Sequence, residues 1–344
     1  MPGESSARIG GLWASGLQEV SSDVSALDSH GRWAVALPYA GTPVLARFAS
    51  WGTEAVEPGA WTGPHPDAWV SSLDEPGYGS RVQRIRDEIA AGSVYQANLC
   101  RVLSALMPDP ATSDVSGLWS LLAAGNPSPF GGYLLLPDHD VAVASASPEL
   151  FLSMRADGSR RILRSGPIKG TGRTPSDLTD KDVAENIMIV DLVRNDLSRV
   201  SEPGSVTVPT LLDVEQHPGL VHLVSCVEGH LIGGTTWPQV VDATFPPGSV
   251  TGAPKIAALD LIGRLETAPR EFYCGAFGWV DADTGEAELA VAIRTFWLRD
   301  GVLRFGTGAG ITWGSDPTAE WRETELKAAH LIQVASGAWQ AGRP

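Results

Sequence analysis

The sequence predicts an α+β fold, in which β-strands follow one another in runs and helices are gathered outside them. Strand-like segments bounded by glycine and proline recur along most of the chain. Longer segments between them carry apolar residues at helical spacing. The chain has 344 residues, 43% of them apolar, which is ample for a sizeable core. Runs of strands with helices outside indicate the α+β class.

The expected elements follow in chain order. The first 60 residues show short strands separated by glycine and proline, residues 62–80 a connection, and residues 81–91 a helix ended by Gly92, with a long strand from Val94. Strands are expected near 33–38, 43–48, 131–136, 141–146, 150–154, 161–163, 205–213, 219–232, 272–280, 287–299 and 302–313. Further helices are expected near 115–124, 179–199, 236–244, 252–267 and 316–336.

The helices expected at 179–199 and 316–336 each carry a pair of acids. Thr179 followed by acids starts the first helix, and Asp316 followed by proline starts the second. The pairs are Asp182 and Glu185 on the first helix, and Glu320 and Glu323 on the second. Residues three apart share one helix face, so both pairs could converge on Mg2+, which prefers one or two carboxylates with waters and substrate oxygens. The alternative is that both pairs are ordinary solvated helix faces.

The segment S-G-P-I-K-G-T at 165–171 places Lys169 between a stiff and a flexible stretch of backbone. Pro167 precedes the lysine and Gly170 follows it, so we expect a turn that holds the side chain in one direction. An amine in a partly desolvated pocket loses its charge and can act as a nucleophile or a base. The alternative is a solvated lysine in a surface loop.

The segment F-P-P-G-S-V-T-G-A-P-K at 245–255 leads from a glycine and proline loop into a helix. Ser249, Thr251 and the free amides at the helix start are suited to an anionic group. The loop is not of the nucleotide-binding kind, because its glycines are too close and no Lys-Ser or Lys-Thr pair follows. A glycine-rich stretch at 306–310 superficially resembles a dinucleotide turn, but a strand continues it where a helix would be required.

Charge and cysteine content exclude several classes of partner. The formal net charge is −15 at pH 7, which argues against nucleic acid or an anionic membrane surface, and any positive field for an acidic substrate must be local. The three cysteines show no C-x-x-C spacing, and the first residues lack the apolar core of a signal peptide. No apolar run approaches membrane-spanning length. We therefore expect a cytoplasmic protein without a membrane or nucleic-acid partner.

Eight ordered motifs resemble those of the chorismate-utilising enzymes. They are S-G-P-I-K-G-T, A-E-N-I-M-I-V-D-L-V-R-N-D, H-L-V-S, P-P-G-S-V-T-G-A-P-K, Y-C-G-A-F-G, A-I-R-T, G-T-G-A-G-I and A-E-W-R-E-T-E-L-K. The resemblance runs from about Arg81 to Val334. It implies the family's α/β/β/α sandwich of two large antiparallel sheets with outer helices. Residues 1–75 would be a shortened strand-rich part of this sandwich, and residues 76–338 the chorismate-binding catalytic region.

Two positions distinguish the reactions of this family, which includes anthranilate synthase component I, aminodeoxychorismate synthase component I, and the isochorismate and salicylate synthases. Lys169 resembles the aminodeoxychorismate synthases, since anthranilate synthases usually have alanine there. Gln96 stands where the isochorismate and salicylate formers have a lysine that activates water, and glutamine cannot act as that base. The resemblance is thus greatest to aminodeoxychorismate synthase component I. The alternatives are an anthranilate or 2-amino-2-deoxyisochorismate former, or a catalytically silent chorismate-binding subunit.

The resemblance also assigns roles residue by residue. Lys169 matches the residue that adds to the substrate, Glu149 the acid that protonates the departing 4-hydroxyl, and His222 a histidine near the ring, whose alternative is a hydrogen-bonded core residue. The substrate-binding positions are Arg294, Tyr273, Gly308, Gly310, Ser249, Gly170, Thr171 and Gln96. The guanidinium fork of Arg294 suits the two oxygens of a carboxylate.

The acid pairs match the magnesium site of the family. Glu185 and Glu323 match its two metal ligands, while Asp182 and Glu320 match acids that assist through water or from behind the ligands. The resemblance therefore implies Mg2+ as the cofactor. One departure is Gly166, which stands where relatives commonly have arginine.

The reaction implied by the resemblance is a double displacement on chorismate. Magnesium binds the ring carboxylate, Lys169 adds at C2, and Glu149 delivers a proton as the 4-hydroxyl leaves. Ammonia then attacks C4 and expels the lysine, which gives 4-amino-4-deoxychorismate. The chain shows no obvious glutaminase nucleophile motif. A separate glutamine amidotransferase subunit, or free ammonia, is therefore the expected source of nitrogen.

Overall fold

The computed structural model describes residues 4–54, 56–158, 160–172, 174–217 and 220–338. Antiparallel pairing joins the strands of these residues into one network of 18 strands. The strands are β1 (Ser6–Ile9), β2 (Leu12–Ser21), β3 (Arg32–Leu37), β4 (Val44–Gly52), β5 (Val70–Ser71), β6 (Gln96–Leu106), β7 (Phe130–Leu136), β8 (Val141–Ser147), β9 (Leu150–Asp157), β10 (Arg160–Gly166), β11 (Ile168–Gly172), β12 (Thr207–His217), β13 (Leu220–His230), β14 (Gly252–Ala253), β15 (Ala276–Asp281), β16 (Glu286–Val291), β17 (Thr295–Arg299) and β18 (Val302–Ile311). The α-helices are α1 (Glu75–Ala90), α2 (Val115–Gly125), α3 (Asp180–Ser198), α4 (Trp237–Thr244), α5 (Lys255–Leu265) and α6 (Pro317–Ala335).

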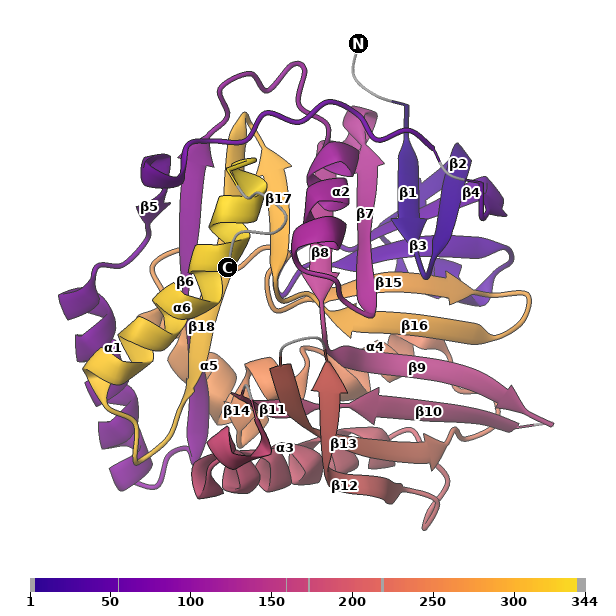
Figure 1. The fold of residues 1–344 in the computed structure, drawn as a ribbon. Helices are drawn as coiled ribbons and strands as arrows, with labels where there is room; N and C mark the ends of the chain where they lie inside the picture. Colours follow the sequence, from indigo (N-terminus) through magenta and orange to yellow (C-terminus); the bar gives the residue numbers. More distant parts are fainter. Residues whose placement is uncertain (1–3, 55, 159, 173, 218–219, 339–344) are drawn as a thin grey trace.

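Two large sheets form the centre of the molecule (Figure 1). In the first, the order of paired strands is β5, β6, β18, β17, β8, β7 and β1. In the second it is β15, β16, β9, β10, β13 and β12, with β11 also paired to β13. The strands β2, β4 and β3 link β1 to β15, so the two sheets are continuous. The predicted α+β class with two large antiparallel sheets is confirmed.

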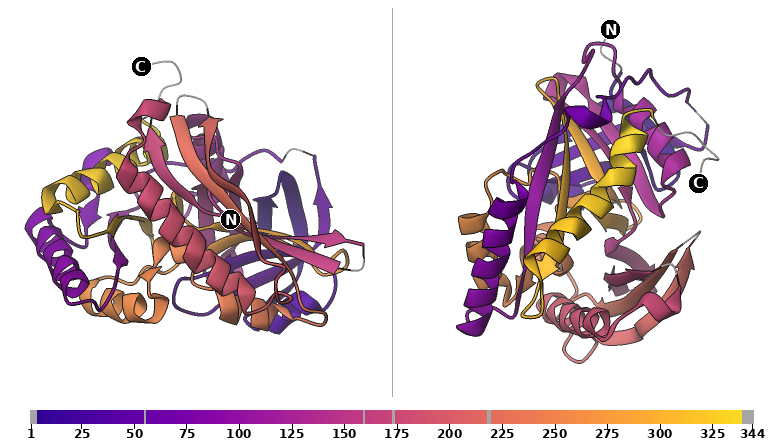
Figure 2. Two further views of the ribbon diagram at one scale, coloured as in Figure 1. Left: turned by 90° about the horizontal axis from the view of Figure 1, so that it is seen from below. Right: turned by 60° about the vertical axis from the view of Figure 1, so that its left-hand side comes forward.

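The helices lie outside the sheets. α2 packs on β7 and β8, α6 on β18 and α1, and α3 on β11, β12 and β13. Figure 2 shows α3 alongside the strands of the second sheet and α6 alongside β18. The first turns of α3 and α6 meet, because Lys181 and Glu320 form an ion pair across them. No helix in the described part of the chain has the length and apolar character that crossing a membrane requires.

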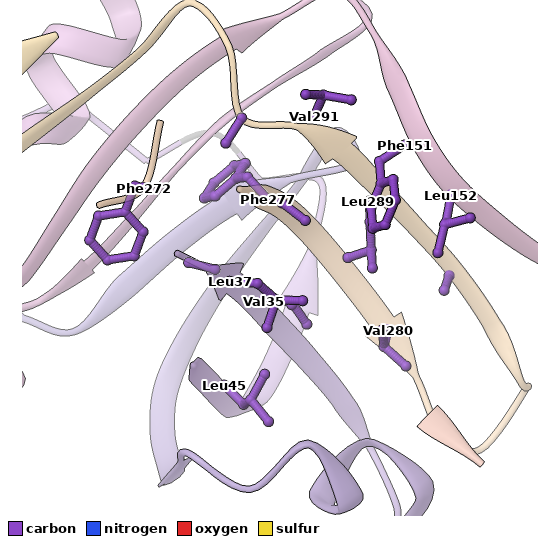
Figure 3. Packing of buried hydrophobic residues seen from close by; sticks show 14 of the residues in the cluster. Val35, Leu37, Leu45, Phe151, Leu152, Phe272, Phe277, Val280, Leu289 and Val291 are labelled. Atoms are coloured by element: carbon purple, nitrogen blue, oxygen red, sulfur yellow. The ribbon is translucent and has the colours of Figure 1, made fainter. Parts of the chain in front are cut away.

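Three clusters of buried apolar side chains fill the fold. The largest includes residues of β3, β9, β15 and β16, and Figure 3 shows part of it. Val35, Phe151, Phe277 and Leu289 are each at most 4% exposed there, and burying one such side chain contributes about 1.5–3 kcal/mol. The second cluster lies beneath α2 and α6, and the third between α1, α5 and β6. The first 75 residues share the largest cluster with the rest of the chain.

The first helix begins earlier than the sequence predicts. α1 starts at Glu75, within the stretch 62–80 that was expected to be a connection. Asp74 caps the helix by accepting a hydrogen bond from the backbone amide of Gly77 at 2.8 Å. Glycine in this first turn weakens the helical pattern in the sequence. Packing of the fully buried Tyr78 against the core stabilises the turn nevertheless.

The single strand predicted at 287–299 is wrong. Two strands, β16 and β17, occupy this range, and Arg294 between them has a φ of 52°. β16 pairs with β15 and β9 in the second sheet, whereas β17 pairs with β18 and β8 in the first. The chain therefore crosses from one sheet to the other at Arg294. The apolar pattern hides the crossing because both strands are buried.

Two other predicted boundaries also differ from the structure. The strand expected at 272–280 begins only at Ala276, after Cys274 with a φ of 64°. The helix expected at 252–267 begins at Lys255, because the two residues of β14 pair with β6 instead. By contrast, α3 and α6 match the predicted helices to within one residue at each end, since capping residues mark their starts.

Candidate active site

Lys169 lies on the strand β11, whereas the sequence predicts a turn. The strand continues through Gly170, which has a φ of 76°, and forms a bulge there. Lys169 pairs with Leu223 and Thr171 pairs with the adjacent His222, so Gly170 has no partner of its own in the register. The conformational freedom of Gly170 therefore allows a bulge in the strand next to Lys169, and the strand does not end there.

Ser249 contacts both of the side chains predicted to do chemistry. Its carbonyl oxygen accepts a hydrogen bond from the Lys169 ammonium at 3.0 Å. Its hydroxyl donates to the carboxylate of Glu149, which also accepts from the backbone amide of Ile168. Glu149 is only 4% exposed. Burial raises the pKa of Glu149, and Lys169 and the hydrogen bonds offset only part of this rise. Glu149 is therefore suited to carry a proton next to an amine.

A buried ion pair holds one side of the loop that carries Ser249. The Lys255 ammonium lies 2.5 Å from a carboxylate oxygen of Asp196. It also donates to the carbonyl oxygens of Thr244 and Pro246, each at 3.0 Å. All three protons of this ammonium are thereby used. Burial raises the pKa of Asp196 and lowers that of Lys255, so the two charges depend on each other.

A second buried ion pair holds the other side of the loop. Arg270 is bound to Glu266 through two hydrogen bonds, of 2.7 and 2.8 Å. Its remaining donors reach the carbonyl oxygens of Val250 and Asn98 at 2.8 and 2.9 Å. Ser249 therefore lies between two anchored carbonyls, which fixes its position relative to Lys169 and Glu149.

Replacing Lys255 by methionine is expected to lower the free energy of unfolding by roughly 3–5 kcal/mol, because Asp196 would stay buried without its counter-charge. The double variant Lys255→Met with Asp196→Leu should recover much of this loss, since apolar side chains can replace a buried ion pair. Urea unfolding of both variants and the wild type measures the effect. A single variant as stable as the wild type would show that the pair does not hold the loop.

Carboxylates from α3 and α6 meet across the space between their first turns. Glu185 of α3 and Glu320 of α6 are 13% and 3% exposed at their side chains. The Lys181 ammonium lies between them, 3.1 Å from Glu320 and 3.7 Å from Glu185. Burial raises the pKa of Glu185, and the negative charges of Glu320 and Glu323 add to the rise, while Lys169 and Lys181 oppose it.

The other two predicted acids have different surroundings. Glu323 is 44% exposed and pairs with Lys327 at 2.6 Å. Burial acts to raise the pKa of Glu323, but Lys327, Lys181 and Lys169 outweigh it and lower that pKa. Asp182 accepts hydrogen bonds from the backbone amide and the hydroxyl of Thr179 at 2.8 and 2.7 Å, so it completes the capping box of α3, whose N-cap residue is Thr179. One of its oxygens is thereby committed to the helix start.

The acid cluster, Glu185, Glu320 and Glu323, has the donor chemistry of a magnesium site. One carboxylate oxygen of Glu185 and one of Glu320 are buried without a hydrogen-bond partner among the described residues. Hard oxygen donors of this kind suit Mg2+. As they stand, however, no three His, Cys, Asp or Glu side chains of the described chain are close enough together to hold a metal ion. The residues fit the cation, but their present partner is the Lys181 ammonium.

Arg294 offers a partly buried positive charge that has no partner among the described residues. No described residue forms a hydrogen bond or an ion pair with its guanidinium, and burial is the cause that lowers its pKa. A partly buried guanidinium without a counter-ion gains from an anion that joins it. Arg294 lies at the crossing between the two sheets, where its φ is 52°. Arg294 is therefore suited to bind a carboxylate of a ligand.

Gln96 and the glycines of β18 lie together beside the acid cluster. A Cβ built on Gly310 would lie 2.5 Å from the amide nitrogen of Gln96 and 3.7 Å from a carboxylate oxygen of Glu185. A Cβ on Gly308 would lie 2.6 Å from the carbonyl oxygen of Leu99. Gly308 therefore has no room for a side chain, whereas a side chain at position 310 would have to displace the Gln96 amide. Gln96 is 1% exposed, and its carbonyl oxygen has no hydrogen-bond partner among the described residues.

Tyr273 and His222 lie in more enclosed positions. Tyr273 is 5% exposed, and its ring covers Gly306, where a Cβ would lie 2.0 Å from the ring. Burial raises the pKa of Tyr273 well above its ordinary value, so its hydroxyl stays neutral. His222 is 4% exposed on β13, in the register position opposite Thr171. The side chain of Thr171 lies outside the described part of the structure.

Comparison with known proteins identifies the group to which this site belongs. The model of the chorismate binding enzyme family matches residues 45–333. The chain belongs to this family. A chorismate-binding enzyme named anthranilate synthase component 1, from Streptomyces coelicolor, is 40% identical over 276 residues, which are 77% of this chain and 52% of that protein. An aminodeoxychorismate synthase of Streptomyces pristinaespiralis is 38% identical over an alignment of 340 positions, which covers 90% of this chain and 46% of that protein.

Solved structures of other chorismate-binding enzymes share the fold. Anthranilate synthase component I from Streptococcus pneumoniae superposes with a TM-score of 0.74 and 25% identity, over 90% of this chain and 84% of that chain. The menaquinone-specific isochorismate synthase of Escherichia coli has a TM-score of 0.79 at 18% identity, over 96% of this chain and 88% of that one. The chain spans about half the length of the curated relatives described above.

The lysine count points to site residues to which the motifs gave no role. The chain has four lysines, Lys169, Lys181, Lys255 and Lys327, so 21 of its 25 basic residues are arginines. All four lysines contact the site or the loop beside it. Two of them also lie four residues from a predicted metal ligand on the same helix, as Lys181 does from Glu185. Asp196 ends one of the quoted motifs without an assigned role, and Arg270 lies outside these motifs.

Proposed function

We propose that this chain aminates chorismate at C4, as the synthase component of an aminodeoxychorismate synthase. The observation that carries the proposal is the Lys169, Ser249 and Glu149 contact, which sets an amine beside a buried carboxyl whose pKa is raised. A relative at 38% identity over 90% of the chain bears the name aminodeoxychorismate synthase. Gln96, with its unpaired carbonyl oxygen, favours ammonia over activated water as the attacking group.

The reaction follows from these groups in two displacements. After the Lys169 ammonium loses a proton to the solvent, its amine forms a bond to C2, the ring double bond shifts, and the 4-hydroxyl leaves as water with the proton of Glu149. Ammonia then forms a bond to C4, the double bond shifts back, and the bond from C2 to Lys169 breaks. The surplus proton of the new amine restores Glu149. The product keeps its enolpyruvyl ether, and one water is released for each ammonia taken up.

Binding of the acidic substrate rests on local positive charge in a chain of net charge −15. Arg294 would hold one carboxylate, since its partly buried guanidinium has no counter-ion among the described residues. Glu185 and Glu323 would hold Mg2+. When bound, the cation would draw electron density from the ring through the other carboxylate of the substrate.

A competing function is the formation of anthranilate, because a relative of that name is 40% identical. Direct attack of ammonia at C2 would lead to anthranilate. In that reaction the Lys169 amine has no role. The contact of Lys169 with Ser249 beside Glu149 favours C4 amination instead. The nitrogen source we propose is a separate glutamine amidotransferase subunit, with free ammonium as a substitute in the test tube.

The proposal is tested by incubating the purified chain with chorismate, Mg2+ and ammonium at alkaline pH. The product is then identified by mass and ultraviolet spectrum. We expect 4-amino-4-deoxychorismate, which retains the pyruvyl group, and no product in the absence of ammonium. Release of pyruvate with the fluorescence of anthranilate would assign the chain to C2 amination. Isochorismate formed without ammonium would refute amination altogether.

Turnover is expected to require Mg2+, and Glu323→Gln should lose most of the activity while the fold survives. The variant removes one carboxylate of the acid cluster, and its 44% exposed side chain contributes little to the core. Chorismate consumption with and without a chelator measures the requirement, and circular dichroism checks the fold. Glu325→Gln, on an exposed face of the same helix, is the matched control. Full activity in excess chelator would contradict the role of the metal.

A further inference from the structure

Lys181 occupies the centre of the acid cluster. Its ammonium bridges carboxylates of two different helices, at 3.1 Å from Glu320 and 3.7 Å from Glu185. Glu320 is 3% exposed, and its second carboxylate oxygen has no partner among the described residues. A buried carboxylate needs a counter-charge, and this ammonium supplies it.

The position of Lys181 also allows its side chain to move out of the acid cluster. Its side chain is 45% exposed, and it belongs to the first turn of α3, where no turn of the helix precedes it. The four-carbon stem can therefore rotate toward solvent without disturbing the helix. Glu185 and Glu320 lack this freedom, since their side chains are largely enclosed.

The lysine count gives an independent reason to regard Lys181 as more than a surface charge. Arginine supplies 21 of the 25 lysines and arginines, yet all four lysines of the chain contact this site or the loop beside it. An ammonium is a compact point charge, whereas a guanidinium is a wide, planar fork. Between two carboxylates from different helices, a compact cation has the size and charge distribution closest to those of a small metal ion.

We propose that Lys181 is the resident counter-cation of the acid cluster, and that a divalent cation binds there only as the Lys181 ammonium withdraws. The proposal rests on the metal requirement within the proposed function and adds its regulation. In the protein without substrate, the lysine keeps the carboxylates paired and makes the affinity for Mg2+ low. Lys181 is thus a positioning residue that decides when the cluster accepts a metal.

The test measures metal binding rather than turnover, on the full chain without chorismate. Mg2+ binding is followed by calorimetry and Mn2+ binding by electron paramagnetic resonance, for the wild type, Lys181→Met and Lys181→Arg. We expect Lys181→Met to bind both cations about tenfold more tightly or better, because a competing charge is gone. Lys181→Arg should bind no more tightly than the wild type.

Lys327→Met is the comparison variant, since it also removes one positive charge beside the cluster, but Lys327 contacts Glu323 of its own helix and the Gly308 carbonyl oxygen and does not bridge carboxylates of two helices. We expect it to change metal affinity much less than Lys181→Met. Thermal unfolding gives a second readout: Lys181→Met should melt lower than the wild type without divalent cation and regain the difference when Mg2+ is added. Equal or weaker metal binding by Lys181→Met would overturn the proposal. A failure of C4 amination with tighter metal binding would leave it standing and refute only the proposed function.

Discussion

Replacing Lys169 by alanine is expected to reduce the formation of 4-amino-4-deoxychorismate by a factor on the order of a hundred or more, the scale for deleting a covalent catalyst. Binding of chorismate and Mg2+ should survive, because the substrate carboxylates are assigned to Arg294 and the metal. The ammonium donates a hydrogen bond to the Ser249 carbonyl oxygen, and loss of this contact should leave the fold largely intact. Product assay by mass, together with calorimetric binding of chorismate, separates the two effects.

Lys169→Arg distinguishes a nucleophile from a simple positive charge. Arginine keeps the charge that lowers the pKa of Glu323 and moderates that of Glu149, but it cannot form the bond to C2. We therefore expect this variant to be as inactive as Lys169→Ala. In the alanine variant, ammonia has open access to C2, so traces of a 2-amino product or anthranilate should appear.

The covalent step can also be observed directly. The wild-type protein, quenched with chorismate in the absence of ammonia, should carry an adduct of substrate minus water on the peptide that contains Lys169. Intact-protein and peptide mass spectrometry detect it. If no adduct forms and Lys169→Arg turns over nearly as well as the wild type, the covalent role is wrong and C4 amination loses its main support.

The sequence predicted those parts of the site that depend on local rules. Thr179 and Asp316 are capping residues with ordinary geometry, so the ends of α3 and α6 were predictable to within one residue. Once both helices are fixed, the three-residue spacing places the acids on their faces. The contact between the two helices depends on the tertiary fold, and the sequence indicated it only through the resemblance to the family.

Other parts depend on contacts that no local pattern records. Arg294 lies where the chain passes between sheets, and a continuous apolar run on both sides conceals the break. Lys169 was expected on a turn because proline and glycine flank it, but pairing with β13 absorbs the glycine as a bulge. The Lys255 and Asp196 pair joins residues 59 positions apart, so only the fold reveals it.

Glu149→Gln is expected to reduce turnover by about 10²- to 10⁴-fold, the range for removing a general acid from a reaction. The amide keeps the size of the side chain and can still hydrogen bond to the Ser249 hydroxyl and the Ile168 amide. Substrate binding should therefore change little. Glu288→Gln is the matched control, because burial also raises the pKa of Glu288, yet this residue lies on β16, away from Lys169.

Glu149→Gln should also make the protein more stable at neutral pH. A substitution that lowers turnover but raises stability identifies Glu149 as a catalytic group whose ionisable carboxyl destabilises the fold. Burial raises the pKa of Glu149 above its ordinary value of 4.5, so the folded state holds this proton more tightly than the unfolded state. Stability from this group is complete below the ordinary pKa and is lost as pH rises through the raised pKa. Glutamine stays neutral throughout, so Glu149→Gln should gain stability over the wild type above that window and match it at acidic pH. Urea unfolding across pH measures the difference, and a variant that is less stable at neutral pH would show that the ionised carboxylate is instead held by Lys169 as a structural ion pair.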